Sequence, residues 1–479
     1  MNKSFKHIPK DQRKKILLIC DDIRVHSGVA TVAKEIVVHT AHHFNWVQIA
    51  GAIKHPDKGR RLDLNKSIEE TTGVNDASVT LYPVDGYGDA NIIRQLIKDE
   101  KPDAIMLITD PRYFTWLFNM EHEIRKTTPI TYLNIWDDYP APMYNKAYYE
   151  ACDLLMGISK QTVNINKIVL GEDKGNRIFK YIPHGLDSNL FKPLDPEDVE
   201  FKKFKNNFFN KNIPEFVVFF NSRNIRRKQI PDTMLAFRSF LDSLPKEKAD
   251  KCKFVLHTEG VSDHGTDLYK VKEYFFDETY PNAIQFSHKK LTTSELNYLY
   301  NIADVQMLLT SNEGWGLTIT EAILAGTPII ANVTGGMQDQ MRFVDENGKW
   351  FTPSPEIPSN HKGTYKEHGE WVFPVYPTSR SIQGSPQTPY IFDDRCKWED
   401  ATEQLIKVYN LSKEERNERG LKGREWVTGD EAGFTSKHQA NRVMEAFNEL
   451  FETWEPREKY QLINATEYKG KFLKHKIYY

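Results

Sequence analysis

Two glutamates flank a glycine-containing turn and the start of a predicted helix in the stretch EGWGLTITEAILAGTPIIANVTGG. Glu313 precedes the turn. Glu321 lies inside the apolar segment LTITEAILA, which ends at a glycine followed closely by a proline. Carboxylates accept hydrogen bonds from hydroxyl groups, so this pair is suited to holding two sugar rings. For Glu321 taken alone, the simpler alternative is a favourable interaction with the helix dipole.

The helix that carries Glu321 is also a candidate anion site. It follows the predicted strand ADVQMLL, so its first N–H groups, at Gly316, Leu317 and Thr318, face the edge where open α/β sheets bind ligands. Such N–H groups bind phosphate well. A diphosphate at these amides, with ribose on one glutamate and a hexose on the other, describes a nucleotide sugar.

Two cations in FFNSRNIRRKQI indicate the same kind of ligand. Arg223 ends a predicted strand, and Lys228 follows in the loop that leads to the helix DTMLAFRSFL. An arginine fork and a lysine point charge at the carboxyl end of a strand can clamp a diphosphate without a metal ion. The alternative is a solvated basic loop.

Three glycines occupy positions where a backbone can approach a ligand closely. Gly335 and Gly336 follow the predicted strand TPIIANV, and Gly28 lies between the first strand and the first helix. We expect Gly28 to face the ligand from the opposite side. For the Gly335–Gly336 pair alone, an ordinary turn is an equal alternative.

These residues need a scaffold, and strands alternate with helix-like stretches in two series. The first series contains KKILLICD, NWVQIAG, DAIMLITD, PITYLNIWD and CDLLMGIS; the second contains EFVVFFNSR, CKFVLHTEG, NAIQFSH, ADVQMLL and TPIIANV. This pattern is typical of parallel sheets with helical crossovers. A linker rich in Pro, Gly and Asp lies at Pro183–Pro196. The sequence therefore predicts two doubly wound α/β domains, residues 1–187 and 188–435.

Two further segments complete the predicted organisation. Residues 342–389 are irregular and are interpreted as an insertion in the second domain, forming either part of the acceptor side, a lid or a surface decoration. Residues 436–479 are expected to form a C-terminal helix and tail. The apolar stripe of this helix, which includes Val443, Phe447 and Leu450, predicts packing against another element.

Composition restricts the class of protein. A formal charge of -2 over 479 residues gives no electrostatic footprint for nucleic acid or an anionic membrane. The four cysteines are far apart in sequence, as expected for thiols in a reducing compartment. No apolar run is long enough for a signal peptide or a transmembrane segment. We therefore expect a cytoplasmic enzyme.

Several other chemistries lack their motifs. The chain has no G-x-S-x-G elbow, no G-x-x-x-x-G-K-[ST] loop and no H-E-x-x-H helix. It also has no D-x-D, so we expect no metal held by that motif against a nucleotide diphosphate. Neither a metal nor a cofactor is expected beyond the sugar nucleotide itself, which is most simply UDP- or GDP-linked.

With these residues in place, the chain resembles the retaining glycosyltransferase group 1 family, whose fold is GT-B. Glu313 and Glu321 match its E-x7-E signature, and Arg223 and Lys228 match the spacing of its R-x4-K clamp. IPHGLDSNLFKP is similar to its interdomain linker, and TGGMQD to its phosphate-side GG loop. The resemblance implies two Rossmann-like domains facing across a cleft, with the C-terminal helix crossing back to the first domain.

The resemblance also assigns roles. It implies that Arg223 and Lys228 bind the donor diphosphate, Glu321 the ribose and Glu313 the transferred sugar. Arg223, Lys228 and the helix amides would then stabilise the charge on the leaving group, which makes Arg223, Lys228 and Glu313 the candidate catalytic residues. The backbone near Gly260 and at residues 288–291 would cradle the base.

The acceptor side departs from the family pattern. The first loop has His26-Ser27-Gly28 where the family usually has a glycine pair, and the usual histidine after the fourth or fifth strand is absent. The residues that remain as acceptor-side candidates are His26, Asp110, Asp137 and Asp138. His184 falls in the predicted linker and is not among the candidates.

The sequence therefore predicts a glycosyltransferase that moves a hexose or pentose from a nucleoside diphosphate sugar to a sugar, a glycan or another acceptor. The resemblance implies retention of configuration, and the cationic clamp predicts independence from metal. Two alternatives stay open. One is a non-catalytic sugar-nucleotide-binding protein, and the other is a phosphorylase-like or epimerase-like enzyme on the same fold.

Overall fold

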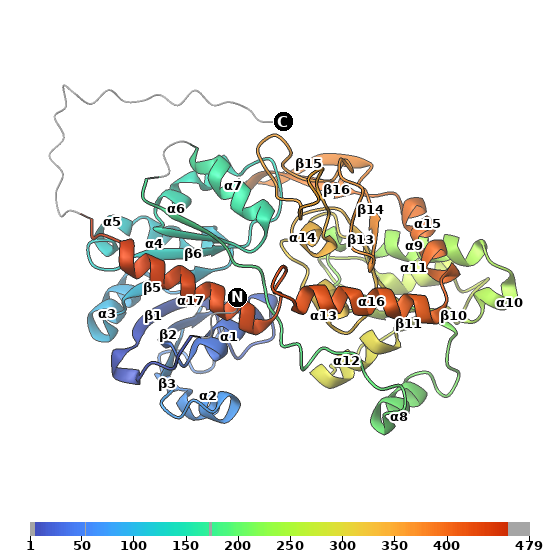
Figure 1. Ribbon diagram of the computed structural model, residues 1–479, viewed down its shortest axis with the longest axis horizontal. Helices are drawn as coiled ribbons and strands as arrows, with labels where there is room; N and C mark the ends of the chain where they lie inside the picture. The colour runs from blue at the N-terminus through green and yellow to red at the C-terminus, as the bar shows by residue number, and fades with distance from the viewer. Residues whose placement is uncertain (1–4, 53, 172–174, 458–479) are drawn as a thin grey trace.

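The computed structural model of the chain describes residues 5–52, 54–171 and 175–457, which form two α/β domains side by side (Figure 1). The sheet of the first domain has the strand order β3-β4-β2-β1-β5-β6-β7-β8, and that of the second has β11-β10-β9-β12-β13-β14. Neighbouring strands in both sheets run parallel, except β3 against β4. The prediction of two parallel-sheet domains is confirmed. The strands are β1 (Lys14–Asp21), β2 (Phe44–Gly51), β3 (Leu62–Asp63), β4 (Val79–Pro83), β5 (Ala104–Ile108), β6 (Ile130–Asn134), β7 (Leu154–Gly157), β8 (Ile178–Tyr181), β9 (Phe216–Asn221), β10 (Cys252–His257), β11 (Ile284–Phe286), β12 (Val305–Leu308), β13 (Ile329–Asn332) and β14 (Val372–Val375).

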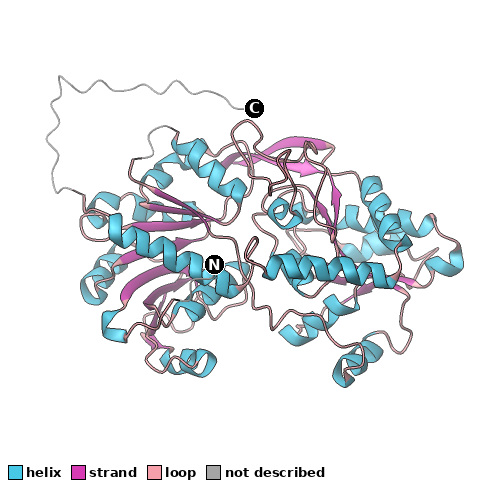
Figure 2. Ribbon diagram, in the orientation of Figure 1, coloured by secondary structure: helices cyan, strands magenta, loops and turns pink. Residues whose placement is uncertain are grey.

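Several central strands are buried along their whole length because helices cover both faces of each sheet (Figure 2). Strands β2, β5, β6 and β7 are buried at every position. A strand buried on both faces does not alternate regularly between apolar and polar residues, so these segments appear in the sequence as largely apolar runs.

Helices begin where polar residues cap them. Ser27 accepts a hydrogen bond from the backbone N–H of Ala30 at the start of α1, and Thr292 forms a capping box with Glu295 at the start of α12. The helices are α1 (Gly28–Thr40), α2 (Asn65–Thr72), α3 (Ala90–Glu100), α4 (Thr115–Phe118), α5 (Glu121–Ile124), α6 (Lys146–Glu150), α7 (Lys160–Leu170), α8 (Val199–Phe208), α9 (Ile230–Asp242), α10 (Lys246–Ala249), α11 (Leu268–Phe275), α12 (Thr293–Ile302), α13 (Leu317–Leu324), α14 (Met337–Met341), α15 (Trp398–Asn410), α16 (Lys413–Thr428) and α17 (Ser436–Thr453), with 3-10 turns η1 (Lys10–Gln12), η2 (Pro111–Phe114), η3 (Met143–Asn145) and η4 (Arg226–Lys228).

The last described helix, α17, lies against α1 of the first domain (Figure 1). Its apolar stripe is buried there, and the rings of Phe447 and Phe44 are 5.7 Å apart. At its start, the hydroxyl of Ser436 donates a hydrogen bond to Glu35. The helix therefore returns to the first domain, as predicted. The tail beyond residue 457 lies outside the described residues.

The prediction of one irregular insertion over residues 342–389 is wrong for its second half. Residues 372–375 form β14 at the edge of the second sheet, and a hairpin follows, built from β15 (Ser379–Ser385) and β16 (Thr388–Arg395). Pro374 obscured β14, because proline is tolerated in a strand mainly at a sheet edge. The first strand of the hairpin is polar and mostly exposed, and the second has only a short apolar stretch at Tyr390, Ile391 and Phe392, so the apolar signal is weak.

Two whole-chain expectations can be compared with the described residues. All four cysteines are unpaired: Cys20, Cys152 and Cys252 are buried and Cys396 is half-buried. Among the described helices, none combines the length and apolar character needed to cross a membrane.

Candidate functional site

A cleft of about 1030 Å³ lies between the two domains, at the carboxyl ends of both sheets. Many of its lining residues lie at the ends of strands. Asp21 is the last residue of β1, Ile108 of β5, Asn221 of β9 and His257 of β10, and Ile158 directly follows β7. Ligands of open α/β sheets bind at this edge, because loops there carry free polar groups. The cleft is therefore the candidate site.

The second-domain wall of the cleft is built around α13. The helix begins after Gly316, whose φ of 84° is in the left-handed region that favours glycine. Leu317 and Thr318 then line the cleft, with their N–H groups in the unpaired first turn of the helix. From the first domain Gly28 faces them, because a Cβ built on Gly28 would lie 3.8 Å from Leu317 Cδ1.

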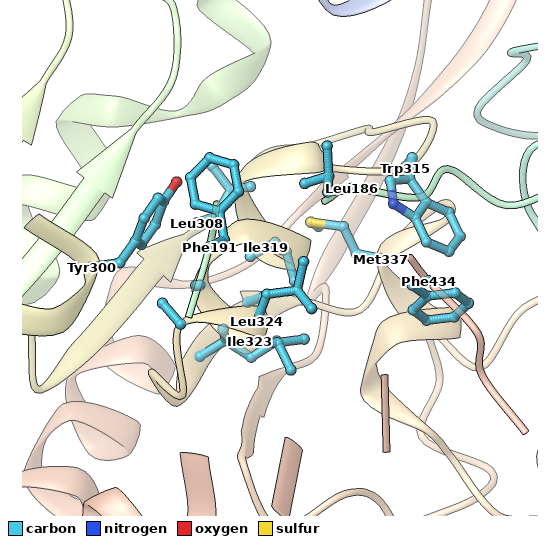
Figure 3. Packing of buried hydrophobic residues seen from close by; sticks show 14 of the residues in the cluster. Leu186, Phe191, Tyr300, Leu308, Trp315, Ile319, Ile323, Leu324, Met337 and Phe434 are labelled. Carbon is cyan, nitrogen blue, oxygen red and sulfur yellow. The ribbon is translucent and has the colours of Figure 1, made fainter. Parts of the chain in front are cut away.

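Apolar packing fixes the direction of α13. The inner face of the helix is buried, and Figure 3 shows it between an aromatic pair from the linker and α12 on one side and a second aromatic pair on the other. In addition, Gln340 Nε2 donates a hydrogen bond of 2.6 Å to the carbonyl oxygen of Trp315. The residues of this cluster that Figure 3 labels are Leu186, Phe191, Tyr300, Leu308, Trp315, Ile319, Ile323, Leu324, Met337 and Phe434.

Glu313 lies between two cations at the floor of the cleft. Arg227 Nη1 is 2.9 Å from Glu313 Oε2, and Lys228 Nζ contacts the same oxygen directly. Burial alone would raise the pKa of Glu313, but the charges of Lys228 and Arg227 outweigh it and lower the pKa to about 2. Burial lowers the pKa of Lys228, although Glu313 opposes this. The three side chains form a preassembled charged cluster.

Arg227 is a residue that sequence reasoning missed. The run Arg226-Arg227-Lys228 was visible, but only the turn η4 places the middle cation against Glu313. Arg223, which was predicted, also lines the cleft, and its side chain is exposed. Arg223 makes no ion pair with any residue that the structure describes.

Glu321 lies one layer behind the cleft wall. Its Oε2 accepts a hydrogen bond of 2.5 Å from Tyr300 Oη and a longer one of 3.5 Å from Asn221 Nδ2. Asn221 lines the cleft, whereas Glu321 does not. Burial, partly opposed by the Tyr300 hydrogen bond, raises the pKa of Glu321 to about 7. The two glutamates therefore have opposite electrostatic environments.

Gly335 and Gly336 lie outside the cleft and serve a close approach of backbone to backbone. A Cβ on Gly335 would be 2.0 Å from the carbonyl oxygen of Glu313, and one on Gly336 would be 2.0 Å from that of Gly314. The N–H of Gly336 donates a 3.0 Å hydrogen bond to Glu313 O. These glycines hold the loop that carries Glu313.

The four acceptor-side candidates separate into two groups. Asp137 lines the cleft, where burial, partly offset by Arg227, raises its pKa to about 6. His26 is exposed at the cleft mouth, and its Nε2 is 2.7 Å from Lys290 Nζ of the other domain. The structure does not bring the other two to the site.

Asp110 caps η2 and pairs with Arg112 at 2.6 Å, away from the cleft. Asp138 is buried 3.7 Å from Arg380 of the hairpin, and burial, followed by the nearby Asp394, raises the pKa of Asp138 well above its ordinary range. Both aspartates follow strand ends, as predicted, but their side chains point into other contacts.

Other cleft residues complete the second-domain wall. Gly260 and His288 line the cleft near its outer end, together with Lys289 and Lys290. His184 also lines the cleft, although it lies in the linker and was not a candidate.

Comparison with known proteins bears on this site. Residues 201–357, which contain the cation cluster, both glutamates and α13, match the family described as glycosyl transferases group 1. Over this segment, about a third of the chain, the protein is similar to the group 1 glycosyltransferases. The predicted family is confirmed, and it is a family of transferase enzymes.

Two curated relatives agree with this assignment. An uncharacterized glycosyltransferase of Methanocaldococcus jannaschii is 26% identical over 25% of this chain and 28% of its own length. The alpha-monoglucosyldiacylglycerol synthase of Acholeplasma laidlawii is 26% identical over 44% of this chain and 49% of its own length. The chain thus spans less than half the length of the curated relatives it matches.

Solved structures extend the likeness to the whole fold. Sucrose-phosphate synthase from Thermosynechococcus elongatus has a TM-score of 0.63 at 15% identity, covering 92% of this chain and 100% of that one. Anabaena HepE, solved in complex with UDP and glucose, has a TM-score of 0.61 at 14% identity, covering 91% and 100%. At these identities the likeness shows the fold, and the predicted GT-B class is confirmed.

Proposed function

We propose that this protein transfers a sugar from a nucleoside diphosphate sugar to an acceptor in the cleft between its domains. The observation that carries the proposal is the arrangement of Arg223, Arg227 and Lys228 with the first amides of α13 on one wall of the cleft. Three cations and a helix N-terminus attract a diphosphate and stabilise its charge when it leaves.

The donor follows from this anchor. The diphosphate lies at the α13 amides, and the transferred sugar reaches Glu313. Glu321 acts on the ribose side through Asn221, which lines the cleft and donates a hydrogen bond to it, and the base lies near Gly260 and residues 288–291. Because a relative of the same fold was solved with UDP and glucose, UDP-glucose is the first donor to test, followed by GDP-linked sugars.

The acceptor approaches from the first-domain wall. Asp137 is the carboxylate on that wall nearest the charged cluster, and Arg227 and Glu313 both influence its charge. The hairpin β15–β16 closes this end, because Phe392 N donates a 2.8 Å hydrogen bond to Tyr139 O and Tyr144 Oη donates one of 3.0 Å to Tyr390 O. The reaction proceeds with retention of configuration and without metal, and the unpaired thiols support a cytoplasmic location.

A donor panel tests the proposal. UDP-glucose, UDP-galactose, UDP-N-acetylglucosamine and GDP-mannose are incubated with the protein, and released nucleoside diphosphate and sugar products are measured. We expect slow donor hydrolysis without acceptor, giving nucleoside diphosphate and free sugar. Binding without any turnover would favour a sugar-nucleotide-binding protein. Free sugar phosphate or an isomerised donor would favour the phosphorylase-like or epimerase-like alternative.

A further inference from the structure

His184 is a buried histidine that lines the cleft without a protein partner. It is 7% exposed, and its Nδ1 is buried without any hydrogen bond. The other histidines that line the cleft are hydrogen-bonded: His257 Nδ1 lies 3.0 Å from Ser287 O, and His288 Nε2 lies 2.9 Å from Tyr269 Oη. His184 is therefore distinct among the cleft histidines of the described chain.

The linker backbone holds His184 rigidly in place. Next to it, a Cβ on Gly185 would be 2.2 Å from the carbonyl oxygen of Thr435, so only glycine fits there. Leu186 exchanges backbone hydrogen bonds with residues 434 and 436, at 3.2 and 3.0 Å. These contacts fix the backbone directly after His184 against residues 434–436. The imidazole is therefore preorganised and does not depend on a mobile loop.

The ring of His184 lies beside the loop that carries Glu313. Its centroid is 6.0 Å from that of Trp315, at an interplanar angle of 69°. Trp315 is two residues after Glu313 and directly precedes the start of α13. His184 is thus on the side of the cleft where the proposed function places the transferred sugar, close to the α13 amides that would hold the diphosphate.

The chemistry of the ring matches a neutral ligand. Burial, only partly opposed by Glu313, lowers the pKa of His184 to about 3, so the imidazole is neutral at ordinary pH. A neutral imidazole has one N–H donor and one acceptor nitrogen, and a sugar hydroxyl offers the same two functions. An anionic phosphate is bound more strongly by the cations and helix amides on the second-domain wall of the cleft. Buried polar groups are nearly always hydrogen-bonded, and a ligand in the cleft that His184 lines would supply a partner that the described residues do not.

We propose that His184 binds a hydroxyl group of the transferred sugar and so helps to select the donor. This inference rests on the proposed function and extends it, because it assigns a sugar contact to a residue outside the charged cluster. The interaction is a hydrogen bond, and no covalent or proton-transfer step is involved.

The test is a double-mutant cycle between the residue and the donor. The variant His184→Phe keeps the ring and removes both nitrogens, and His184→Asn keeps a polar group if the first variant folds poorly. Each is assayed with UDP-glucose and with its 2-, 3-, 4- and 6-deoxy analogues, or with the deoxy series of whichever panel donor turns over. Affinity for UDP is measured alongside by calorimetry.

A matched control separates the contact from the cost of altering a buried histidine. His43 is 6% exposed and its Nδ1 is also buried without a partner, but it packs in the first domain against α17, where Nε2 is 3.3 Å from Asn448 Oδ1. The variant His43→Phe should show the same relative rates for the deoxy donors as the wild type.

We expect kcat/KM for the parent donor to fall by about 3- to 10-fold in His184→Phe, the range of one neutral hydrogen bond. With the wild type, kcat/KM for one deoxy analogue should be lower than for the parent donor by the same factor. With the variant, that analogue and the parent donor should have equal kcat/KM, and the affinity for UDP should be unchanged. Equal losses for every analogue in both proteins would overturn the inference, as would a matching loss of UDP affinity. Absence of turnover by the wild type would overturn the proposed function and this inference together.

Discussion

The two walls of the cleft differ in the chemistry they present. The second-domain wall carries charges: the Arg227–Lys228–Glu313 cluster, the exposed Arg223 and the lysines at the outer end. The first-domain wall is largely apolar and hydrogen-bonded. Its apolar lining residues are Val29, Val32, Ile108, Ile135 and Ile158.

The polar groups on the first-domain wall mostly satisfy one another. Asp21 accepts a 2.5 Å hydrogen bond from Ser27 Oγ and a 2.7 Å one from Tyr87 Oη. A ligand that meets both walls therefore finds its charged part recognised by the second domain and its neutral part by the first. If the proposed function holds, we expect the second domain alone to bind the donor diphosphate, and the following experiments test this expectation.

The largest expected effect comes from Glu313→Gln. The substitution preserves shape but removes the charge that faces the transferred sugar, so we expect kcat to fall by about 100-fold, as for loss of a single electrostatic contact in a transition state. UDP should bind at least as tightly, because Lys228 and Arg227 lose their internal counter-charge. Steady-state kinetics and calorimetry measure both quantities. A variant with lost UDP affinity and normal kcat would reverse the assigned roles.

The cation clamp gives the next effect. Arg223→Ala and Lys228→Ala should each weaken UDP binding by about 10-fold or more, since charge-assisted hydrogen bonds contribute roughly 1.5–3 kcal/mol. The two variants should differ in stability. Lys228→Ala leaves Glu313 buried with one partner fewer and should lower the melting temperature, whereas Arg223 has no ion pair to lose.

A double variant separates these contributions of Lys228. Adding Glu313→Gln to Lys228→Ala should recover the melting temperature without recovering UDP affinity. Wild-type affinity in both single variants would show that the second-domain wall does not hold the diphosphate.

A smaller effect is expected from Glu321→Gln. A few-fold loss of UDP affinity would follow from one altered ribose contact. Stability should also respond to pH. The pKa of Glu321 is raised from 4.5 to about 7 in the fold, so the protonated form stabilises the protein below pH 4.5, and this contribution is lost as the pH rises through 7. The melting temperature of Glu321→Gln relative to that of the wild type should therefore increase from pH 5 to pH 8.

Glu313→Gln is the matched control, because the pKa of Glu313 is lowered to about 2. Its ionised form stabilises the fold above pH 4.5, so that variant should be less stable than the wild type at both pH values. Identical pH responses of the two variants would contradict the opposite environments assigned to the two glutamates.

Sequence reasoning located the parts of the site that depend on local geometry. Glu313, Leu317 and Thr318 lie on one strand–turn–helix unit, so their placement at the cleft follows from the order of elements alone. The same holds for Arg223 and Lys228 after β9. The parallel sheets were predictable because their buried strands are continuous apolar runs.

Residues that depend on distant contacts were not predictable. A glycine after a strand is compatible with close approach either to a ligand or to another backbone segment, so the sequence could not decide the role of Gly335. Only the packed loop shows that Gly335 lies against the carbonyl oxygen of Glu313. Arg227 required the orientation of η4. His184 is held by Thr435 and its neighbours from the other end of the chain, and the edge strand β14 and the polar hairpin carry no periodic pattern.

The hairpin β15–β16 supplies a prediction about the acceptor alone. Tyr390 contacts the first domain, with its ring 4.9 Å from that of Tyr144. Tyr390→Ala should raise the KM for acceptor by about two- to three-fold, on the order of one lost packing or hydrogen-bonding contact, and leave UDP affinity unchanged. Ile382→Ser, on the same hairpin but 63% exposed, is the control and should change neither. A normal acceptor KM in Tyr390→Ala would make the hairpin a surface decoration.

The smallest expected effect is that of a chelator. In the proposed function the diphosphate is neutralised by Arg223, Arg227, Lys228 and the α13 amides, and Glu313 is already paired with two of these cations. Turnover in EDTA should therefore equal that in Mg²⁺ within error.

Asp137 makes this last comparison sharp, because it is the cleft carboxylate on the first-domain wall nearest the cluster. If EDTA abolished turnover, Mn²⁺ restored it and Asp137→Asn removed the Mn²⁺ response, a metal held by the first domain would share the diphosphate. The charge asymmetry between the walls would then not decide donor binding. The expected result is that EDTA and Mg²⁺ give equal rates, both for the wild type and for Asp137→Asn compared with its own rate without additions. The second-domain cations alone would then stabilise the charge on the leaving group.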